Sequence, residues 1–338
     1  MNRIKWIDSM KAFSIMAVVL NHTHHILPAL VPFVYIICLP AFFFSAGMFT
    51  NTNLSLKEFF LKKTRRLLIP FFFFGIVTWV FWLFVLRKYG PDTDAVSPWW
   101  LPLFGLVCGK SEMLLQNSPL WFLCCLVSLE GIYYLICRVR KKWIRLVIVS
   151  CLGIFGCVLS YLEQNWIWEI SAACIILPVY AIGAEYRPWI QSKAQSIRLS
   201  HLLICLVISA IGIYFGATYN SGIGLHTSYI GNPILYYISC ICVIGFWFSI
   251  AILIDRYLNH TEWLQYIGRN TLFILCSHMA TFSIIKGIAV ACNVSLNFFG
   301  TNLGCLCLWA GSFAILIPAS FFVNRYCPWI LGKTRTNP

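Results

Sequence analysis

The segment RIKWIDSMKAFSIMAVVLNHTHH, residues Arg3–His25, decides how this chain is interpreted. It begins with basic residues and one acid, Asp8, continues as an apolar run that contains Lys11, and ends in a polar cluster around His22. A helix turns about 100° per residue, so Lys11 and His22 share one face, about 16 Å apart along the axis. Because an apolar helix has no packing reason to carry such a stripe, we interpret the stripe as functional.

The composition indicates a membrane protein. Of the 338 residues, 60% are hydrophobic and 11% are charged, whereas a soluble domain has about 25% charged residues. Apolar runs of about 20 residues predict transmembrane helices, because lipid leaves backbone groups no partner outside the helix. We therefore expect an all-α polytopic membrane protein with about ten transmembrane helices in a single domain, 1–338. The expected spans are 10–28, 31–50, 67–86, 119–137, 146–162, 168–186, 200–217, 233–253, 270–290 and 304–323.

The basic residues predict the orientation of these spans. The net charge is +14, and 21 of the 25 Lys and Arg residues fall on one side if the N-terminus is cytoplasmic. The positive-inside rule then predicts that both termini are cytoplasmic. Because the basic residues lie in short loops between spans, we expect no nucleic-acid partner. Residues 51–66 are expected to form a cytoplasmic basic amphipathic segment, and residues 87–118 an extracytoplasmic loop or re-entrant segment.

Cysteine usage points to neither a metal site nor a disulfide framework. Most of the 16 cysteines lie inside the expected spans, where cysteine behaves as a small hydrophobic residue. No CxxC pair occurs with a suitable partner pair. We expect no bound metal.

Titratable groups inside spans are functional candidates, because a charged or polar group is costly in lipid. The catalytic candidates are His22, Lys11, His278 and Glu130. Polar or aromatic residues near the outer ends of the first and fourth spans are candidates for substrate binding. They are His25, Asn21 and Trp121.

A second notable segment is LSLKEFFLKKTRRLL, residues Leu54–Leu68. Ser55 precedes Glu58 at the spacing of a capping box, which predicts a helix start. Two readings of its cations stay open: a basic helix held by anionic lipid, or a site for a phosphate-rich cofactor. The candidate cofactor-binding residues are Lys62, Lys63, Arg65 and Arg66, with Arg269 at the cytoplasmic start of the ninth span.

Five segments, taken in order, resemble the acyltransferase 3 family of integral membrane acyltransferases. They are Arg3–His22, Pro40–Phe49, Lys63–Pro70, Leu120–Leu123, and Gly268–Leu272 followed by His278. The run KKTRRLLIP looks closest to the branch that resembles fucose 4-O-acetylases. Three features depart from the family pattern. Lys11 stands where the family often has Arg, and Ser45-Ala46-Gly47 where it usually has Ser-Gly. The loop has Lys62-x-x-Arg65 and Lys63-x-x-Arg66 where the family often has Arg-x-x-Arg.

The resemblance implies a multi-pass enzyme of the bacterial inner (cell) membrane that O-acetylates cell-surface sugars. It implies acetyl-CoA as co-substrate, a carbohydrate or lipid-linked sugar as acceptor, and membrane lipid as surroundings. Histidine, with an ordinary pKa of about 6.5, suits removal of a proton from a sugar hydroxyl. We therefore expect His22 to be the base and the loop cations to hold CoA phosphates. Two roles stay open for Lys11, orienting the groups around the base or stabilising the thioester oxyanion, and His278 or Glu130 would orient groups from across the bundle. Direct transfer and a covalent acyl-enzyme relay both remain open.

Two other classes of function compete with this interpretation. A secondary transporter or flippase for a sugar-linked or anionic substrate would suit ten spans and titratable groups at mid-membrane. Transporters often contain inverted repeats and paired broken helices, and the sequence contains no convincing example. A non-catalytic membrane scaffold would leave the histidine cluster unexplained.

Overall fold

The computed structural model describes residues 4–23, 30–51, 53–89, 97–220 and 222–333. These ranges are helical apart from connections and one isolated β-bridge between Gly224 and Tyr229. Nine helical stretches in the described ranges are long and apolar enough to cross a membrane, which confirms the prediction of an all-α polytopic membrane protein. They are Val31–Met48, Leu56–Leu86, Ser118–Ile136, Lys142–Tyr161, Ile167–Glu185, Leu199–Tyr219, Pro233–Tyr257, Thr271–Ala291 and Asn302–Tyr326.

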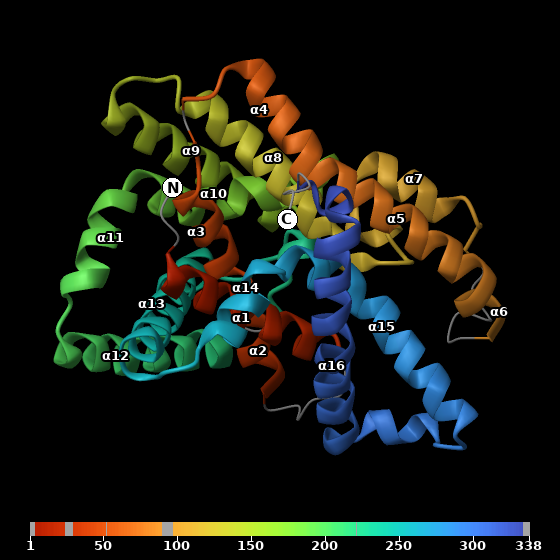
Figure 1. The fold of residues 1–338 in the computed structure, drawn as a ribbon. Helices are drawn as coiled ribbons and strands as arrows, with labels where there is room; N and C mark the ends of the chain where they lie inside the picture. Colours follow the sequence, from red (N-terminus) through yellow and green to blue (C-terminus); the bar gives the residue numbers. More distant parts are fainter. Residues whose placement is uncertain (1–3, 24–29, 52, 90–96, 221, 334–338) are drawn as a thin grey trace.

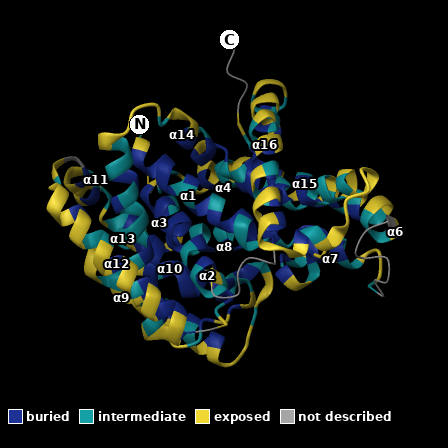
Figure 2. Cartoon of the chain, turned by 90° about the horizontal axis from the view of Figure 1, so that it is seen from below, coloured by how far each residue is buried: buried dark blue, intermediate teal, exposed yellow. Residues whose placement is uncertain are grey.

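Helix α1 (Lys5–Asn21) is the remaining expected span and lies in the middle of the bundle. It packs against α2 (Val31–Cys38), α3 (Pro40–Met48), α13 (Pro233–Tyr257), α14 (Glu262–Arg269), α15 (Thr271–Ala291) and α16 (Asn302–Tyr326) (Figure 1). Small buried residues of α1, such as Ser9 and Ala12, let these neighbours approach closely. In Figure 2 the interior around α1, α3 and α8 is buried, whereas α9, α11 and α12 present exposed faces to the outside.

The closest helix contact on α1 occurs at Gly268 of α14. A Cβ atom at this position would lie 1.8 Å from the backbone carbonyl oxygen of Asp8. Only glycine fits such an approach of two backbones. The contact sets Arg269 beside the N-terminal half of α1, and the chain then continues into α15, which carries His278 towards the other end of α1.

The second expected span, 31–50, is two helices instead of one. Helix α2 ends at Cys38 and α3 begins at Pro40, with Leu39 between them at φ −103°. Proline has no backbone N–H, so the hydrogen bond to the carbonyl four residues earlier is lost and the helix is interrupted. The break leaves Leu39 half-buried between the two helices.

The basic segment forms the first turns of a long helix. The elements follow without interruption: α4 (Leu56–Lys63), the π-helical η2 (Thr64–Leu68), α5 (Ile69–Phe81), the π-helical η3 (Trp82–Leu86) and α6 (Arg87–Tyr89). The predicted capping box is confirmed: the Glu58 backbone N–H donates to Ser55 Oγ at 3.3 Å, and the Ser55 backbone N–H donates to the Glu58 carboxylate at 2.8 Å.

The other helices complete the bundle and its outer connections. Within 97–118 the chain forms the eight-residue helix α7 and a single turn, η4, and α7 is too short to cross a membrane. The remaining elements are α7 (Leu101–Cys108), η4 (Ser111–Met113), η5 (Ser118–Leu120), α8 (Trp121–Ile136), α9 (Lys142–Tyr161), η6 (Ile167–Glu169), α10 (Ile170–Glu185), α11 (Arg187–Ser196), α12 (Leu199–Tyr219), η7 (Leu225–Thr227), η8 (Leu296–Gly300) and η9 (Pro328–Leu331).

Replacing Gly268 by alanine tests the contact between α14 and α1. The added methyl group meets a backbone atom that cannot rotate away, so we expect Gly268→Ala to destabilise the protein by about 1–3 kcal/mol. The matched control is Gly287→Ala in α15, where an added Cβ meets nothing within 4 Å. Alanine at position 287 should leave the thermal unfolding midpoint unchanged or raise it, because alanine favours the helix more than glycine does. Thermal unfolding midpoints in detergent measure both variants, and equal midpoints would contradict the proposed contact.

Candidate functional site

A large cavity opens between α1, the basic segment and the C-terminal part of the chain. Its volume is about 1060 Å³. Among the described residues it is lined by six cationic side chains and one carboxylate, that of Glu58. We call it the basic cavity. Its cations are Lys11, Lys62, Arg65, Arg66, Arg269 and Lys333.

Four separate parts of the chain supply these cations. Lys11 comes from α1, where its Nζ lies 2.9 Å from Asp8 Oδ1 in an ion pair one helical turn away. Lys62, Arg65 and Arg66 come from α4 and η2, and Arg269 ends α14. The structure thus places Lys11, predicted as a catalytic residue, in one cavity with four cations predicted to bind the cofactor. Sequence reasoning missed the sixth, Lys333, because it lies beyond the last span and outside any motif.

Lys63 and Glu130 lie elsewhere and form an ion pair with each other. Both line a separate pocket of about 130 Å³ that also contains Tyr134. Adjacent residues on a helix point about 100° apart, which explains why Lys62 faces the basic cavity while Lys63 does not. This pocket shares Lys62 and Arg66 with the basic cavity, so Lys63 lies beside two of the other predicted cofactor-binding cations. Glu130 does not line the outer end of α1 with His22.

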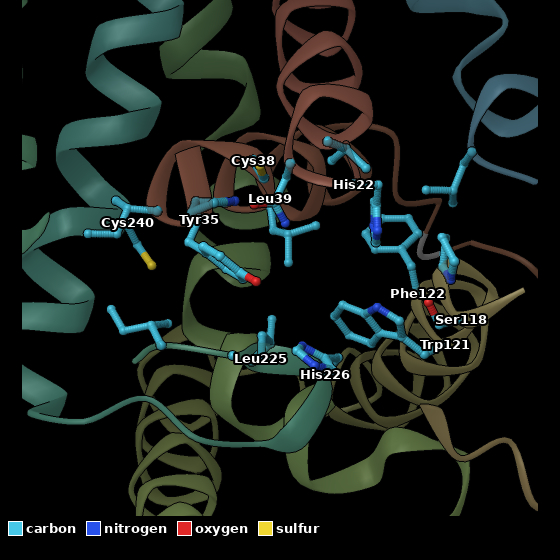
Figure 3. A pocket seen from close by; sticks show the side chains of 18 of the residues that line it. His22, Tyr35, Cys38, Leu39, Ser118, Trp121, Phe122, Leu225, His226 and Cys240 are labelled. Carbon is cyan, nitrogen blue, oxygen red and sulfur yellow. The ribbon is translucent and has the colours of Figure 1, made fainter. Parts of the chain in front are cut away.

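A second, smaller cavity lies at the other end of α1 and has a volume of about 190 Å³. We call it the outer cavity. Its lining includes the predicted residues Asn21, His22 and Trp121, together with Tyr35 and His226, which were not predicted. Figure 3 shows the Tyr35 hydroxyl directed into the open space, with Trp121 and His226 on the opposite side from His22.

The His226 loop is held in place by buried hydrogen bonds. Ser111 Oγ donates to the His226 carbonyl oxygen at 2.7 Å, and the Ser111 backbone N–H donates to the buried Glu169 carboxylate at 2.9 Å. Asn165 Nδ2 donates to the same His226 carbonyl at 3.3 Å. Burial lowers the pKa of the His226 imidazole, against a smaller raising effect of the Glu112 carboxylate. The ring is therefore neutral at pH 7 and offers one donor and one acceptor.

The outer cavity adjoins a further cavity of about 310 Å³. The two share part of their lining, including Tyr35 and His226. This adjoining cavity also reaches Asn220 and Thr227 of the segment between α12 and α13. The sequence hinted at this region only through its Gly, Tyr and His content. Together the two cavities provide room for a ligand that extends beyond a single small ring.

His22 and His278 come into contact beside the outer cavity. The centroids of their imidazole rings are 5.1 Å apart. His278 is fully buried, and its Nδ1 lies 3.0 Å from the Ile274 carbonyl oxygen. A carbonyl oxygen only accepts, so Nδ1 carries the proton and Nε2 of the neutral ring is an acceptor. Nε2 has no hydrogen-bond partner among the described residues. Nε2 of His278 can thus accept a hydrogen bond from a neighbouring group.

A thin apolar layer separates the two cavities. Four residues line both of them, and we call these four the septum: Val18, Leu39, Phe122 and Leu275. They come from α1, the break between α2 and α3, α8 and α15. The basic cavity and the histidine pair are therefore on opposite sides of one layer of side chains.

The remaining predicted site residue, His25, lies outside the described residues. Within the described residues no group of three or more His, Cys, Asp or Glu side chains is placed to hold a metal ion.

Comparison with known protein families gives one match. The model of the acyltransferase 3 family, described as an acyltransferase domain, matches residues 4–328. The chain belongs to the acyltransferase 3 family. No curated protein and no solved structure matches it. Membership of the acyltransferase 3 family makes this chain a membrane acyltransferase. It favours acyl transfer over transport as the class of function, and it does not extend to the fucose 4-O-acetylase-like branch.

A double-mutant cycle on Lys63 and Glu130 tests whether their ion pair is structural. Their side chains are 19% and 11% exposed, so removing one partner leaves a largely buried charge. We expect Lys63→Met and Glu130→Gln each to lower the free energy of unfolding by about 1–3 kcal/mol, and the double variant to recover part of this loss. Unfolding midpoints of the four proteins in detergent give the coupling. Strictly additive effects would show that the two side chains do not stabilise each other.

Proposed function

We propose that this acyltransferase moves an acetyl group from cytoplasmic acetyl-CoA to a hydroxyl group of a cell-envelope sugar or polysaccharide. The observation that carries the proposal is the position of the His22–His278 pair. It lies beside an outer cavity lined by aromatic and polar side chains, and one apolar layer away from a cavity rich in cations.

The charge of the basic cavity supports a donor that carries phosphates. Arginine can bind a phosphate through two parallel hydrogen bonds, and lysine acts as a compact point charge. Arg65, Arg66 and Arg269 supply the first type of contact and Lys11 and Lys62 the second. Such a set suits the phosphates of CoA. The apolar septum at the far end suits the uncharged pantetheine arm and the acetyl group.

The lining of the outer cavity supports a sugar acceptor. Trp121 offers a flat apolar face, while Tyr35, Asn21 and the neutral His226 ring offer hydrogen-bonding groups. A few placed polar groups on an otherwise apolar wall is the usual composition of a small-molecule site. The adjoining cavity would take a second sugar unit or a lipid carrier.

In the proposed reaction, His22 removes the proton from the acceptor hydroxyl. The acceptor oxygen forms a bond to the acetyl carbonyl carbon, the bond from that carbon to sulfur breaks, and CoA leaves as a thiol after taking up a proton. His278, through its acceptor Nε2, orients the His22 ring and stabilises its protonated form. In a relay, the His22 nitrogen would first take the acetyl group while its ring proton passes to CoA, which leaves as a thiol. The acceptor hydroxyl would then take the acetyl group and return its proton to His22. Both orders use the same pair of side chains.

The proposed location is the inner (cell) membrane of a bacterium, with the basic cavity facing the cytoplasm. The distribution of Lys and Arg along the chain supports this orientation. Acetyl-CoA is then supplied on the side where the cations lie, and the outer cavity faces the cell envelope. The surrounding membrane lipid and the sugar acceptor are the expected partners.

The His22→Ala variant tests the catalytic assignment. Loss of a general base should lower kcat by about 10²–10⁴-fold, while CoA binding to the basic cavity should persist. The measurement is incubation of purified protein with labelled acetyl-CoA, followed for CoA release and for label on glycans. His201→Ala is the control, because His201 is exposed on α12. A correctly folded, membrane-inserted His22→Ala protein that acetylates at the wild-type rate would disprove the assignment. Accumulation of the labelled sugar acceptor in vesicles without acyl transfer would favour the transporter alternative.

Enlarging a septum residue tests whether the acetyl group passes between the two cavities. Leu39 lies at the helix break and is only half-buried, so Leu39→Trp should fill the septum with limited strain on the fold. We expect the rate of acetyl transfer to fall by more than about tenfold, which corresponds to about 1.4 kcal/mol in the barrier of that step. The affinity for CoA should stay within about twofold of the wild-type value. Leu203→Trp on the exposed face of α12 is the control. Unchanged transfer in Leu39→Trp would mean that the acetyl group takes another route.

A further inference from the structure

The chain returns to the basic cavity after its last membrane helix. The turn η9 (Pro328–Leu331) follows α16, and Pro328, Leu331, Gly332 and Lys333 all line the cavity. None of these residues belongs to the basic segment or to the motif around Arg269. The C-terminal turn therefore forms a separate wall of the basic cavity.

Gly332 fixes where this turn lies. It has φ +63°, in the left-handed region that favours glycine. A Cβ atom at Gly332 would lie 2.0 Å from the backbone carbonyl oxygen of Arg65 in the π-helical η2. The Lys333 backbone N–H closes the turn by donating to the Pro328 carbonyl at 3.0 Å. The turn is therefore docked directly on the backbone of the segment that supplies Arg65 and Arg66.

The side chain of Lys333 is held by a series of amide hydrogen bonds. Its Nζ donates to Asn324 Oδ1 at 2.5 Å, and Asn324 Nδ2 donates to Asn270 Oδ1 at 2.7 Å. Asn270 follows Arg269 directly, so the series connects Lys333 to the motif at the start of α15. This arrangement orders a long side chain before any ligand binds, which reduces the entropy lost on binding.

Lys333 is held among charges of its own sign. Although Lys333 is exposed, partial desolvation of its ammonium group lowers its pKa, and the positive charges of Arg269 and Lys11 lower it further. Asn324 is a neutral partner and does not compensate the positive charge. Six cations against one lining carboxylate leave the basic cavity strongly positive among the described residues. A cation positioned in this way is stabilised when an anion enters.

We propose that the C-terminal turn, residues 327–333, is part of the donor-binding site and that Lys333 binds a phosphate group of the CoA donor. The inference rests on the proposed function and adds to it a residue and a segment. Lysine contributes a point charge, so the contact contributes to donor affinity and not to the chemical step at His22. The ligand class is an organic phosphate, for which CoA is the probe.

The test compares Lys333→Gln with Lys333→Arg, using acetyl-CoA and S-acetylpantetheine, which lacks the phosphates. We expect Lys333→Gln to raise KM for acetyl-CoA about tenfold with kcat unchanged, and to leave KM for S-acetylpantetheine unchanged. Lys333→Arg should restore most of the affinity because it retains the charge. Calorimetric titration with CoA gives the same comparison without turnover. Lys193→Gln on the exposed face of α11 is the matched control.

A second variant tests the turn itself. Gly332→Ala puts a side chain against the Arg65 backbone at a strained φ, so the turn should move and CoA affinity should fall even though Lys333 is intact. An unchanged KM for acetyl-CoA in Lys333→Gln, or an equal loss with both donors, would overturn the inference. Either result leaves the proposed function standing if His22→Ala remains inactive. Failure of the wild-type protein to bind or consume acetyl-CoA would instead overturn the proposed function.

Discussion

The contact between the Asp8 carbonyl of α1 and Gly268 of α14 is the constraint on which the site depends. It brings two backbones closer than any side chain would allow. From this point α1 continues to His22, and α14 leads through Asn270 into α15 and its His278. The two routes meet again at the ring contact between His22 and His278. One close approach near the basic cavity therefore sets both Arg269 beside Lys11 and the two histidines beside each other.

The arrangement separates charge from proton chemistry. Cations are gathered in one cavity, where water or an anionic ligand can offset their charge, and the two imidazoles lie beyond an apolar septum. Burial of an unpaired charge beside His22 would be costly, and it would also shift the proton affinity of the base. The septum keeps the cations of the basic cavity away from His22. Leu39, one of its four residues, lies at the break between α2 and α3.

The basic segment illustrates how local structure selects the ligand-facing side chains. Its helix changes from α to π geometry at Thr64, which adds a residue per turn and alters the direction of every side chain that follows. Lys62, Arg65 and Arg66 face the basic cavity, whereas Lys63 turns to Glu130. The C-terminal turn docks on the same π-helical backbone through Gly332. The C-terminal turn thus packs on the π-helical part of the basic segment, although the two are far apart in the sequence.

Much of the fold was predictable from the sequence. The apolar runs determined the membrane class and the positions of the spans, because lipid forces backbone groups to pair within each helix. The Ser55–Glu58 cap and the stripe of Lys11 and His22 followed from helical periodicity alone. Which side chains share a cavity depended on contacts between segments hundreds of residues apart, and periodicity within one helix carries no information about these. Hence Lys333, His226 and Tyr35 were missed, and Glu130 was grouped with His22, with which it shares no cavity. The sequence by itself determined that Lys11 and His22 follow one another on one face of the helix α1. Only the tertiary structure decided that these groups open onto two cavities with a septum between them, because that depends on how closely the helix backbones pack.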